Sequence, residues 1–156
     1  MSGTREVLYV DIRVIQVTPF QTNCYVLRDG DEAIVVDPGD VPSELLEAVD
    51  GYRLVAIVNT HGHCDHCGGN GRLMARTGAR LLLHESDVPL LRTIREQGMM
   101  FGVPFEASPE PDGLLHEVEQ LKVGVVELNV WHAPGHSPGH IMLSLENDGQ
   151  AFVFTG

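Results

Sequence analysis

The segment "NTHGHCDHCGGN" gathers side chains that bind metals: within six residues it holds His61, His63, Asp65 and His66. A second window, "HAPGHSPGH", adds His132, His136 and His140. Zinc in catalytic sites takes imidazole and carboxylate ligands and keeps one coordination position open. Bound zinc lowers the pKa of water to roughly 7 and so supplies hydroxide at neutral pH. The two windows therefore predict a catalytic metal site.

The first window lies where a sheet protein places its ligands. The run "LVAIVNT", residues 54–60, predicts a strand, so His61 follows the carboxyl end of that strand. In an extended segment, residues two apart point to the same side, which directs His61 and His63 toward one cation. Asp65 and His66 can turn toward a neighbouring position, and the glycines of the segment permit the tight path. The alternative is a solvated polar turn.

The second window predicts a stiff Pro/Gly turn after another strand, which would hold His136 as a distant third ligand. For His132 we expect an ordinary place on the strand surface, with support of the ligands as the alternative. For His140 we also expect an ordinary role, although it could contact substrate or donate to a neighbour. His84 and His116 are assigned to ordinary structure.

Three cysteines leave two further interpretations open. Cys64 and Cys67 form a C-x-x-C pair, which could be half of a structural zinc site or a redox motif. A structural site needs a second ligand pair, and the remaining cysteine, Cys24, is far away in sequence. We therefore expect Cys64 to fill a slot between ligands and Cys67 to pack the first turn of a helix. An odd number of cysteines makes no disulfide framework, and a reducing cytoplasm is the expected location.

Composition predicts one globular domain over residues 1–156, with 43% hydrophobic and 21% charged residues. The net charge of −12 disfavours nucleic acid and anionic membranes as partners, because both attract clusters of Lys and Arg. A small-molecule substrate remains compatible, since a bound dication reverses the local field. The segment "MSGTREVLYVDIRV" has no signal-peptide pattern, and no run is long enough to span a membrane. Oligomeric state is left open.

The apolar patterns predict strands interspersed with helices, and hence a layered α/β or α+β domain. Strands are expected at 10–17, 23–28, 32–37, 54–60, 80–84, 125–133, 140–146 and 151–156. Helices are expected at 42–51 with Ser43 as N-cap, at 70–78 ending at Gly78, and at 85–98 starting near Pro89. Residues 99–115 predict a loop, whose Met99, Met100, Phe101 and Phe105 would be partial core or an apolar wall over the site.

The ordered set His-x-His-x-Asp-His with the later "PGHSPGH" resembles the metallo-β-lactamase fold superfamily, and both windows are most similar to its glyoxalase II-type hydrolases. The segment "TPFQTNCYVLRDGDEAIVVDPGD" is similar to that group's opening strands, whose Asp-Pro-Gly turn, here Asp37 to Gly39, lies near the metal. The resemblance implies an α+β fold, a four-layer αββα sandwich with metals at one edge. It implies that the first metal is held by His61, His63 and His136. Asp65 and His66 would contribute to a second metal, and Asp65 would also act in catalysis by orienting the attacking hydroxide or taking its proton.

The sequence departs from that family at its end. The family's Thr-Gly-Asp motif supplies a metal-bridging aspartate after a strand such as "AFVFTG", and a further histidine comes later, but this sequence stops at Gly156. We therefore expect a fragment in which the second half of the sandwich is incomplete. One or two zinc ions are expected, with iron or manganese as alternatives, and the second ion is expected to bind weakly.

By this resemblance the activity is metal-dependent hydrolysis of a thioester such as a hydroxyacyl-glutathione. Three alternatives stay open: a lactonase or other acyl hydrolase of the same fold, an iron-dependent persulfide dioxygenase, and a fragment that merely binds metal. A nucleic-acid-cleaving enzyme is disfavoured by the acidic charge.

Overall fold

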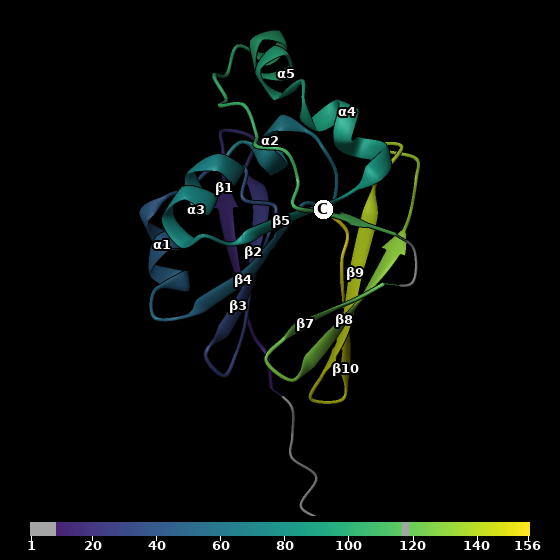
Figure 1. Ribbon diagram of the computed structural model, residues 1–156. Helices are drawn as coiled ribbons and strands as arrows, with labels where there is room; N and C mark the ends of the chain where they lie inside the picture. Colours follow the sequence, from purple (N-terminus) through teal and green to yellow (C-terminus); the bar gives the residue numbers. More distant parts are fainter. Residues whose placement is uncertain (1–8, 117–118) are drawn as a thin grey trace, which may run out of the picture.

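Two β-sheets face each other in the computed structural model, which describes residues 9–116 and 119–156 (Figure 1). The first eight residues, part of the segment inspected for a signal peptide, lie outside the described residues. The first sheet has the strand order β1-β2-β3-β4-β5-β6, and the second has the order β10-β9-β8-β7. Strands β1 to β3 pair antiparallel, whereas β3 to β6 pair parallel.

The first sheet contains β1 (Asp11–Val17), β2 (Thr22–Asp29), β3 (Glu32–Val36), β4 (Arg53–Val58), β5 (Arg80–His84) and β6 (Gly113–Leu115). The second contains β7 (Gln120–Val123), β8 (Val126–His132), β9 (Ile141–Asn147) and β10 (Gln150–Phe154). The helices are α1 (Ser43–Val49), α2 (Cys64–Cys67), α3 (Asn70–Thr77), α4 (Val88–Leu91) and α5 (Ile94–Phe101), with a 3-10 turn η1 (Glu85–Asp87) before α4.

The central strands of the first sheet, β3 to β5, are buried on both faces, which divides the apolar residues into two cores. On β3, Ala33 and Val35 pack with the helices, while Ile34 and Val36 pack against the second sheet. A strand covered on both faces reads as a continuous apolar run, and "EAIVV" has that form. The second sheet alternates instead: on β8, Val126, Leu128 and Val130 are buried and the residues between them are not.

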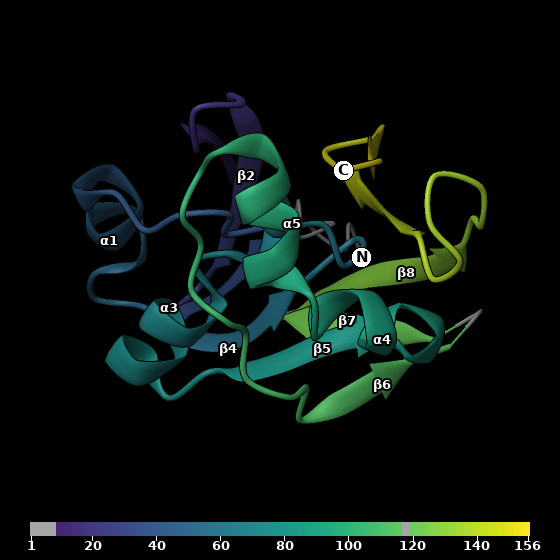
Figure 2. The same ribbon diagram turned by 90° about the horizontal axis from the view of Figure 1, so that it is seen from above.

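Helices cover only one outer side of the described sandwich. α1 and α3 lie against the outer face of the first sheet (Figure 2). Within residues 9–116 and 119–156, no helix lies on the outer face of the second sheet, where Trp131 and Val153 are exposed. The described residues thus form three layers of the expected αββα arrangement.

Several local predictions were wrong. Ser43 is the first residue of α1 rather than its N-cap, which is Pro42 and makes no side-chain capping bond. A single helix was expected over 85–98. The structure has instead a 3-10 turn followed by two short helices, with Arg92 and Thr93 between them. Helix α2 and strands β6 and β7 were not predicted. Each has four residues or fewer, which is too short to show a hydrophobic periodicity. The stop of α3 at Gly78 is confirmed, with φ at +69°.

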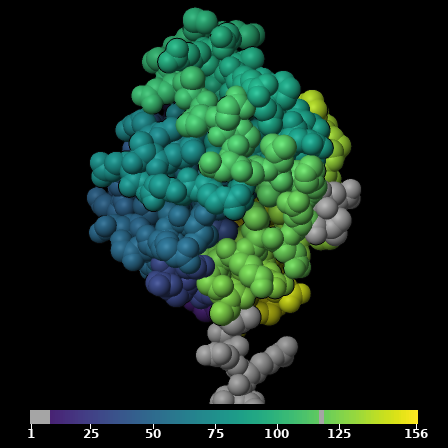
Figure 3. Space-filling view, viewed as in Figure 1, coloured from purple at the N-terminus to yellow at the C-terminus, as the bar shows by residue number. Residues whose placement is uncertain are grey.

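The expectation for the Met- and Phe-rich segment was also largely wrong. Met99, Met100 and Phe101 belong to α5 rather than to a loop, and their exposed fractions are 74%, 83% and 64%. Of the four apolar residues, only Phe105 packs against the core. The reason is the position of α5, which projects beyond the sheets at one end of the molecule (Figures 1 and 3). Among the described helices, none combines the length and the apolar character that a membrane crossing requires.

Candidate metal centre

Both histidine windows lie at the same end of the two sheets. His61 and His63 follow β4 of the first sheet, and His136 lies in the loop between β8 and β9 of the second. A backbone hydrogen bond from Ile141 N–H to the Thr60 carbonyl, 2.8 Å long, ties the start of β9 to the residue before His61. Residues 75 positions apart in sequence therefore meet because two sheets end side by side.

The imidazoles of His61, His63 and His136 converge. One ring nitrogen of each lies within 4.8 Å of the others. The ring centroids are 4.7 to 4.8 Å apart in all three pairs, and His63 Nδ1 lies 3.1 Å from His136 Nε2. His61 is buried, His63 is half-buried and His136 is exposed, so the group opens toward solvent on one side.

The tautomer of His61 follows from its neighbours. Thr60 Oγ1 lies 2.7 Å from Asp37 Oδ2 and therefore donates to that carboxylate. The same Thr60 oxygen, 2.9 Å from His61 Nδ1, is left to accept, which places the proton of His61 on Nδ1. The lone pair of His61 is then on Nε2, a buried atom with no hydrogen-bond partner among the described residues. A buried polar atom without a partner is costly, and a cation would satisfy it.

The protonation states of the group fit a metal as well. Burial lowers the pKa of His61 far below its ordinary value, and the neighbouring imidazoles of His66 and His63 lower it further. Burial, followed by the proximity of His136, also lowers the pKa of His63. Neutral imidazole is the form that ligates a metal. The donor set, the unpartnered Nε2 of His61 and the neutral rings of His61 and His63 therefore fit a divalent cation.

A second group of donors lies behind the first. Asp37, His61 and His66 are all buried and also hold ligand atoms within 4.8 Å of one another. Asp37 has no exposed surface and accepts hydrogen bonds from Thr60 N–H and from His66 Nδ1, at 2.7 and 2.9 Å. Burial alone would lower the pKa of His66, but its hydrogen bonds to Asp37 and Asp65 raise the pKa to about 10. Asp37 was expected only near the site, on the strength of the Asp-Pro-Gly turn. The structure places its carboxylate within the site.

Asp65 contacts His66, a member of the second donor group. Its Oδ2 accepts a hydrogen bond of 2.8 Å from Thr22 Oγ1 and lies 3.3 Å from His66 Nε2. Burial would raise the pKa of Asp65, but the hydrogen bond with His66, the charge of His66 and the bond from Thr22 together hold it well below its usual range. Asp65 is part of neither donor group found among the described residues. Its predicted role as a metal ligand stays a prediction.

The remaining histidines divide between the site and its surroundings. His140 borders the cluster, with its ring 5.0 Å from that of His61, and its Nε2 donates to the Thr155 carbonyl at 2.6 Å. His132 supports the His136 loop, because its Nε2 donates to the Pro138 carbonyl at 2.9 Å. The ring of His84 stacks on that of His132 with centroids 4.0 Å apart, and His116 lies beyond it, 6.2 Å from His84.

The cysteines are core residues. Cys24, Cys64 and Cys67 are free and buried, and none belongs to a donor group among the described residues. Cys67 Sγ donates to the His61 carbonyl at 3.1 Å. Burial raises the pKa of the Cys64 and Cys67 thiols, which disfavours the reactive thiolate. The packing matches the role expected for Cys67 and gives no support to a zinc half-site.

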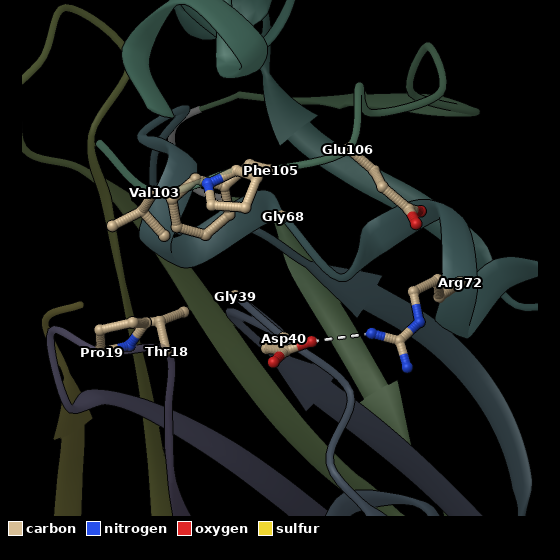
Figure 4. Close-up of a pocket in the computed structure, with 10 residues that line it drawn as sticks. Thr18, Pro19, Gly39, Asp40, Gly68, Arg72, Val103, Phe105 and Glu106 are labelled. Atoms are coloured by element: carbon tan, nitrogen blue, oxygen red, sulfur yellow. Dashed lines mark hydrogen bonds and ion pairs between the residues drawn. The ribbon is translucent and has the colours of Figure 1, made fainter. Parts of the chain in front are cut away.

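A pocket of about 380 Å³ lies beside the C-terminal end of α2, where Gly68 lines it (Figure 4). It is lined by Thr18, Pro19, Gly39, Asp40, Gly68, Arg72, Val103, Pro104, Phe105 and Glu106. The Arg72 guanidinium is hydrogen-bonded to Asp40 at 2.9 Å on one side of the opening. A Cβ on Gly39 would lie 1.7 Å from the Asp65 carbonyl oxygen, so only glycine allows this wall to approach α2. None of the clustered histidines lines the pocket.

Comparison with known proteins finds relatives whose sequences are similar to most of this chain. A protein of Aquifex aeolicus is 38% identical over 130 residues, which cover 82% of this chain and 62% of the relative. The hydroxyacylglutathione hydrolase GloC of Haemophilus influenzae is 34% identical over 137 residues, which cover 85% of this chain and 65% of GloC. The chain therefore spans less than two thirds of the length of these relatives.

Solved structures agree on the fold. TTHA1623, crystallised in a di-iron-bound form, matches with a TM-score of 0.80 at 32% identity, over 92% of this chain and 71% of that one. The B3 metallo-beta-lactamase BLEG-1 matches with a TM-score of 0.79 at 29% identity, over 94% and 71%. Residues 17–156 match the sequence profile described as the Metallo-beta-lactamase superfamily. On this match, together with the facing sheets and the converging histidines, the chain belongs to the metallo-beta-lactamase superfamily.

Proposed function

We propose that this protein is a zinc-dependent hydrolase that cleaves a thioester such as a hydroxyacyl-glutathione. The observation that carries the proposal is the convergence of His61, His63 and His136, with the unpartnered Nε2 of His61 among them. Three imidazoles that leave one side open match the ligand set of catalytic zinc.

In this proposal His61, His63 and His136 hold the first metal, and Asp65 and His66 contribute to a second. When bound, such a cation acts as a Lewis acid, lowering the pKa of water to roughly 7 and polarising a carbonyl group. Zinc is proposed because imidazole nitrogens suit it, and iron is the alternative because they suit iron too. A relative, TTHA1623, holds two irons, which supports including iron in the test.

Asp65 is proposed to orient the attacking water. Its carboxylate is half-buried, its Oδ2 is held by Thr22 Oγ1, and its lowered pKa keeps it an acceptor of hydrogen bonds rather than a donor. A carboxylate held in this way can fix the direction of a water molecule. Its low basicity makes it a poor final proton acceptor, so orientation is its main contribution.

The substrate class is proposed from the relatives. Proteins named hydroxyacylglutathione hydrolase from Haemophilus influenzae and from Anaeromyxobacter dehalogenans are each 34% identical to this chain. The net charge of −12 supports a small-molecule substrate over nucleic acid or an anionic membrane surface. The buried, reduced cysteines support a cytoplasmic location.

The test is hydrolysis by the chain as it stands, purified without added metal and then loaded with zinc or iron. Release of thiol from a hydroxyacyl-glutathione, lost on chelation and restored by zinc, is the expected result. No thiol release with either metal, together with turnover of a lactone or a β-lactam, would replace the thioesterase by another acyl hydrolase. Oxygen consumption with a persulfide by the iron-loaded chain alone would favour the dioxygenase.

A further inference from the structure

Asp87 is a buried carboxylate that joins the two loops carrying the clustered histidines. It ends the 3-10 turn η1 and has no exposed surface. Its Oδ2 accepts hydrogen bonds from Gly62 N–H at 2.8 Å and from Ser137 Oγ at 2.6 Å, and its Oδ1 accepts one from Gly139 N–H at 2.6 Å. All three bonds are buried.

The three donors occupy particular places in the sequence. Gly62 lies between His61 and His63, whereas Ser137 and Gly139 follow His136 in the other loop. One carboxylate therefore holds the segment after β4 and the segment after β8 at the same time. Because the two loops come from different sheets, a side chain that bonds to both of them restricts how far apart they can lie.

The packing around Asp87 leaves little freedom. A Cβ on Gly139 would lie 2.6 Å from Asp87 N and 2.9 Å from Asp87 Oδ1. A Cβ on Gly62 would lie 3.0 Å from the Asp87 carbonyl oxygen and 2.9 Å from Leu91 N. Contacts this close exclude side chains at both positions, so the glycines allow each loop to reach the carboxylate directly.

Asp87 has no ion-pair partner among the described residues, although a buried carboxylate is costly without compensation. The three short hydrogen bonds to Asp87 supply part of the compensation for its buried charge. A cation held by the histidines would add to that compensation.

Asp87 does not itself ligate a metal in this arrangement. Both of its oxygens already accept hydrogen bonds, and it belongs to neither donor group within the described residues. Its influence on the histidines passes through the backbone of Gly62 and through Ser137 and Gly139. Partners that orient metal ligands commonly change metal affinity by about 10- to 100-fold when they are removed.

We propose that Asp87 is a positioning residue that fixes the His136 loop against the His61–His63 loop and so sets the geometry of the metal centre. The inference rests on the proposed metal site. The discriminating variant is D87N, because an asparagine has nearly the shape of aspartate but offers one acceptor oxygen instead of two. Its NH₂ group would face Gly139 N–H, or else Gly62 N–H and Ser137 Oγ, so at least one donor loses its partner.

The experiment measures zinc affinity by competition with a chelator, and the visible spectrum of the Co²⁺-loaded chain, which reports ligand geometry. We expect D87N to bind zinc about 10- to 100-fold more weakly and to shift the Co²⁺ spectrum. S137A keeps the charge of Asp87 and removes one of its three bonds, so a smaller loss in the same direction is expected. The matched control is D112N, because exposed Asp112 accepts a backbone bond from Leu81 N–H at the other end of β5.

Wild-type affinity and an unchanged Co²⁺ spectrum in D87N would overturn the positioning role while leaving the metal site intact. Equal losses in D87N and D112N would also overturn it, because they would indicate a general effect of removing a structural carboxylate. If D87N does not fold, S137A decides between the same two results. A wild-type chain that binds neither zinc nor Co²⁺ would overturn the metal site itself, and the positioning role with it.

Discussion

His63 Nδ1 and His136 Nε2 lie 3.1 Å apart although 73 residues separate them in sequence. A distance of this size between two ring nitrogens is compatible with a shared proton or a shared cation. Because burial and the proximity of His136 lower the pKa of His63, the neutral form of His63, with a lone pair free to ligate, is favoured. The contact therefore places two of the proposed ligands where one metal ion could take both.

Replacing His136 tests the proposed ligand set. H136A removes one of three imidazoles, and we expect zinc affinity to fall by more than the roughly 100-fold that loss of an outer partner causes. Metal content after dialysis against a zinc buffer measures the change. H116A is the control, since the exposed His116 lies outside the cluster. Retention of one tight zinc per H136A chain would contradict the assignment.

Asp65 should matter for turnover more than for binding at the first metal position. D65N removes the charge that orients water and leaves His61, His63 and His136 in place, so kcat should fall by about 10²- to 10⁴-fold with zinc still bound. Steady-state hydrolysis of a hydroxyacyl-glutathione, together with zinc content, checks both parts. E47Q on the exposed side of α1 should leave kcat unchanged. A D65N enzyme with wild-type kcat would remove Asp65 from the chemistry.

The stack of His84 on His132 should make folding sensitive to acid. Burial, and then the charge of His132, lower the pKa of His84 in the folded chain. The unfolded chain therefore binds more protons as the pH falls below about 6.5, so His84 contributes less stability at acid pH. We expect the loss of unfolding free energy caused by H84Q, without metal, to be smaller at pH 5.5 than at pH 8.

Urea unfolding of wild type and H84Q at both pH values measures that difference, and the other histidines cancel because both chains contain them. A penalty for H84Q that stays constant or grows on acidification would show that His84 is not destabilised by protonation.

The exposed side of α5 should tolerate substitution. Met100 is 83% exposed, so M100Q should change the free energy of unfolding by less than about 0.5 kcal/mol. L73A, at a fully buried position of α3, should cost about 2–5 kcal/mol. Urea unfolding of the two variants compares them directly. A large cost for M100Q would mean that α5 is covered in solution.

The residue types and their spacing were enough to predict that His61, His63 and His136 converge, because these residues carry their chemistry in the side chain. Strands with long apolar runs, such as β3, β4 and β5, are recognisable from their pattern. Short elements such as β6 and α2 are not recognisable in this way, because three or four residues are too few to show a hydrophobic periodicity.

Tertiary structure alone decided which polar residues support that site and which apolar residues are buried. Asp87 lies in the run "ESDVP", where no local pattern marks it as part of a site. Its carboxylate gains three hydrogen-bond donors only because two loops from different sheets approach it. Met99 to Phe101 are apolar, yet they are exposed because α5 extends past the sheets that could have covered it. Local sequence determines chemistry and periodicity, whereas burial and long-range hydrogen bonds depend on where distant segments meet.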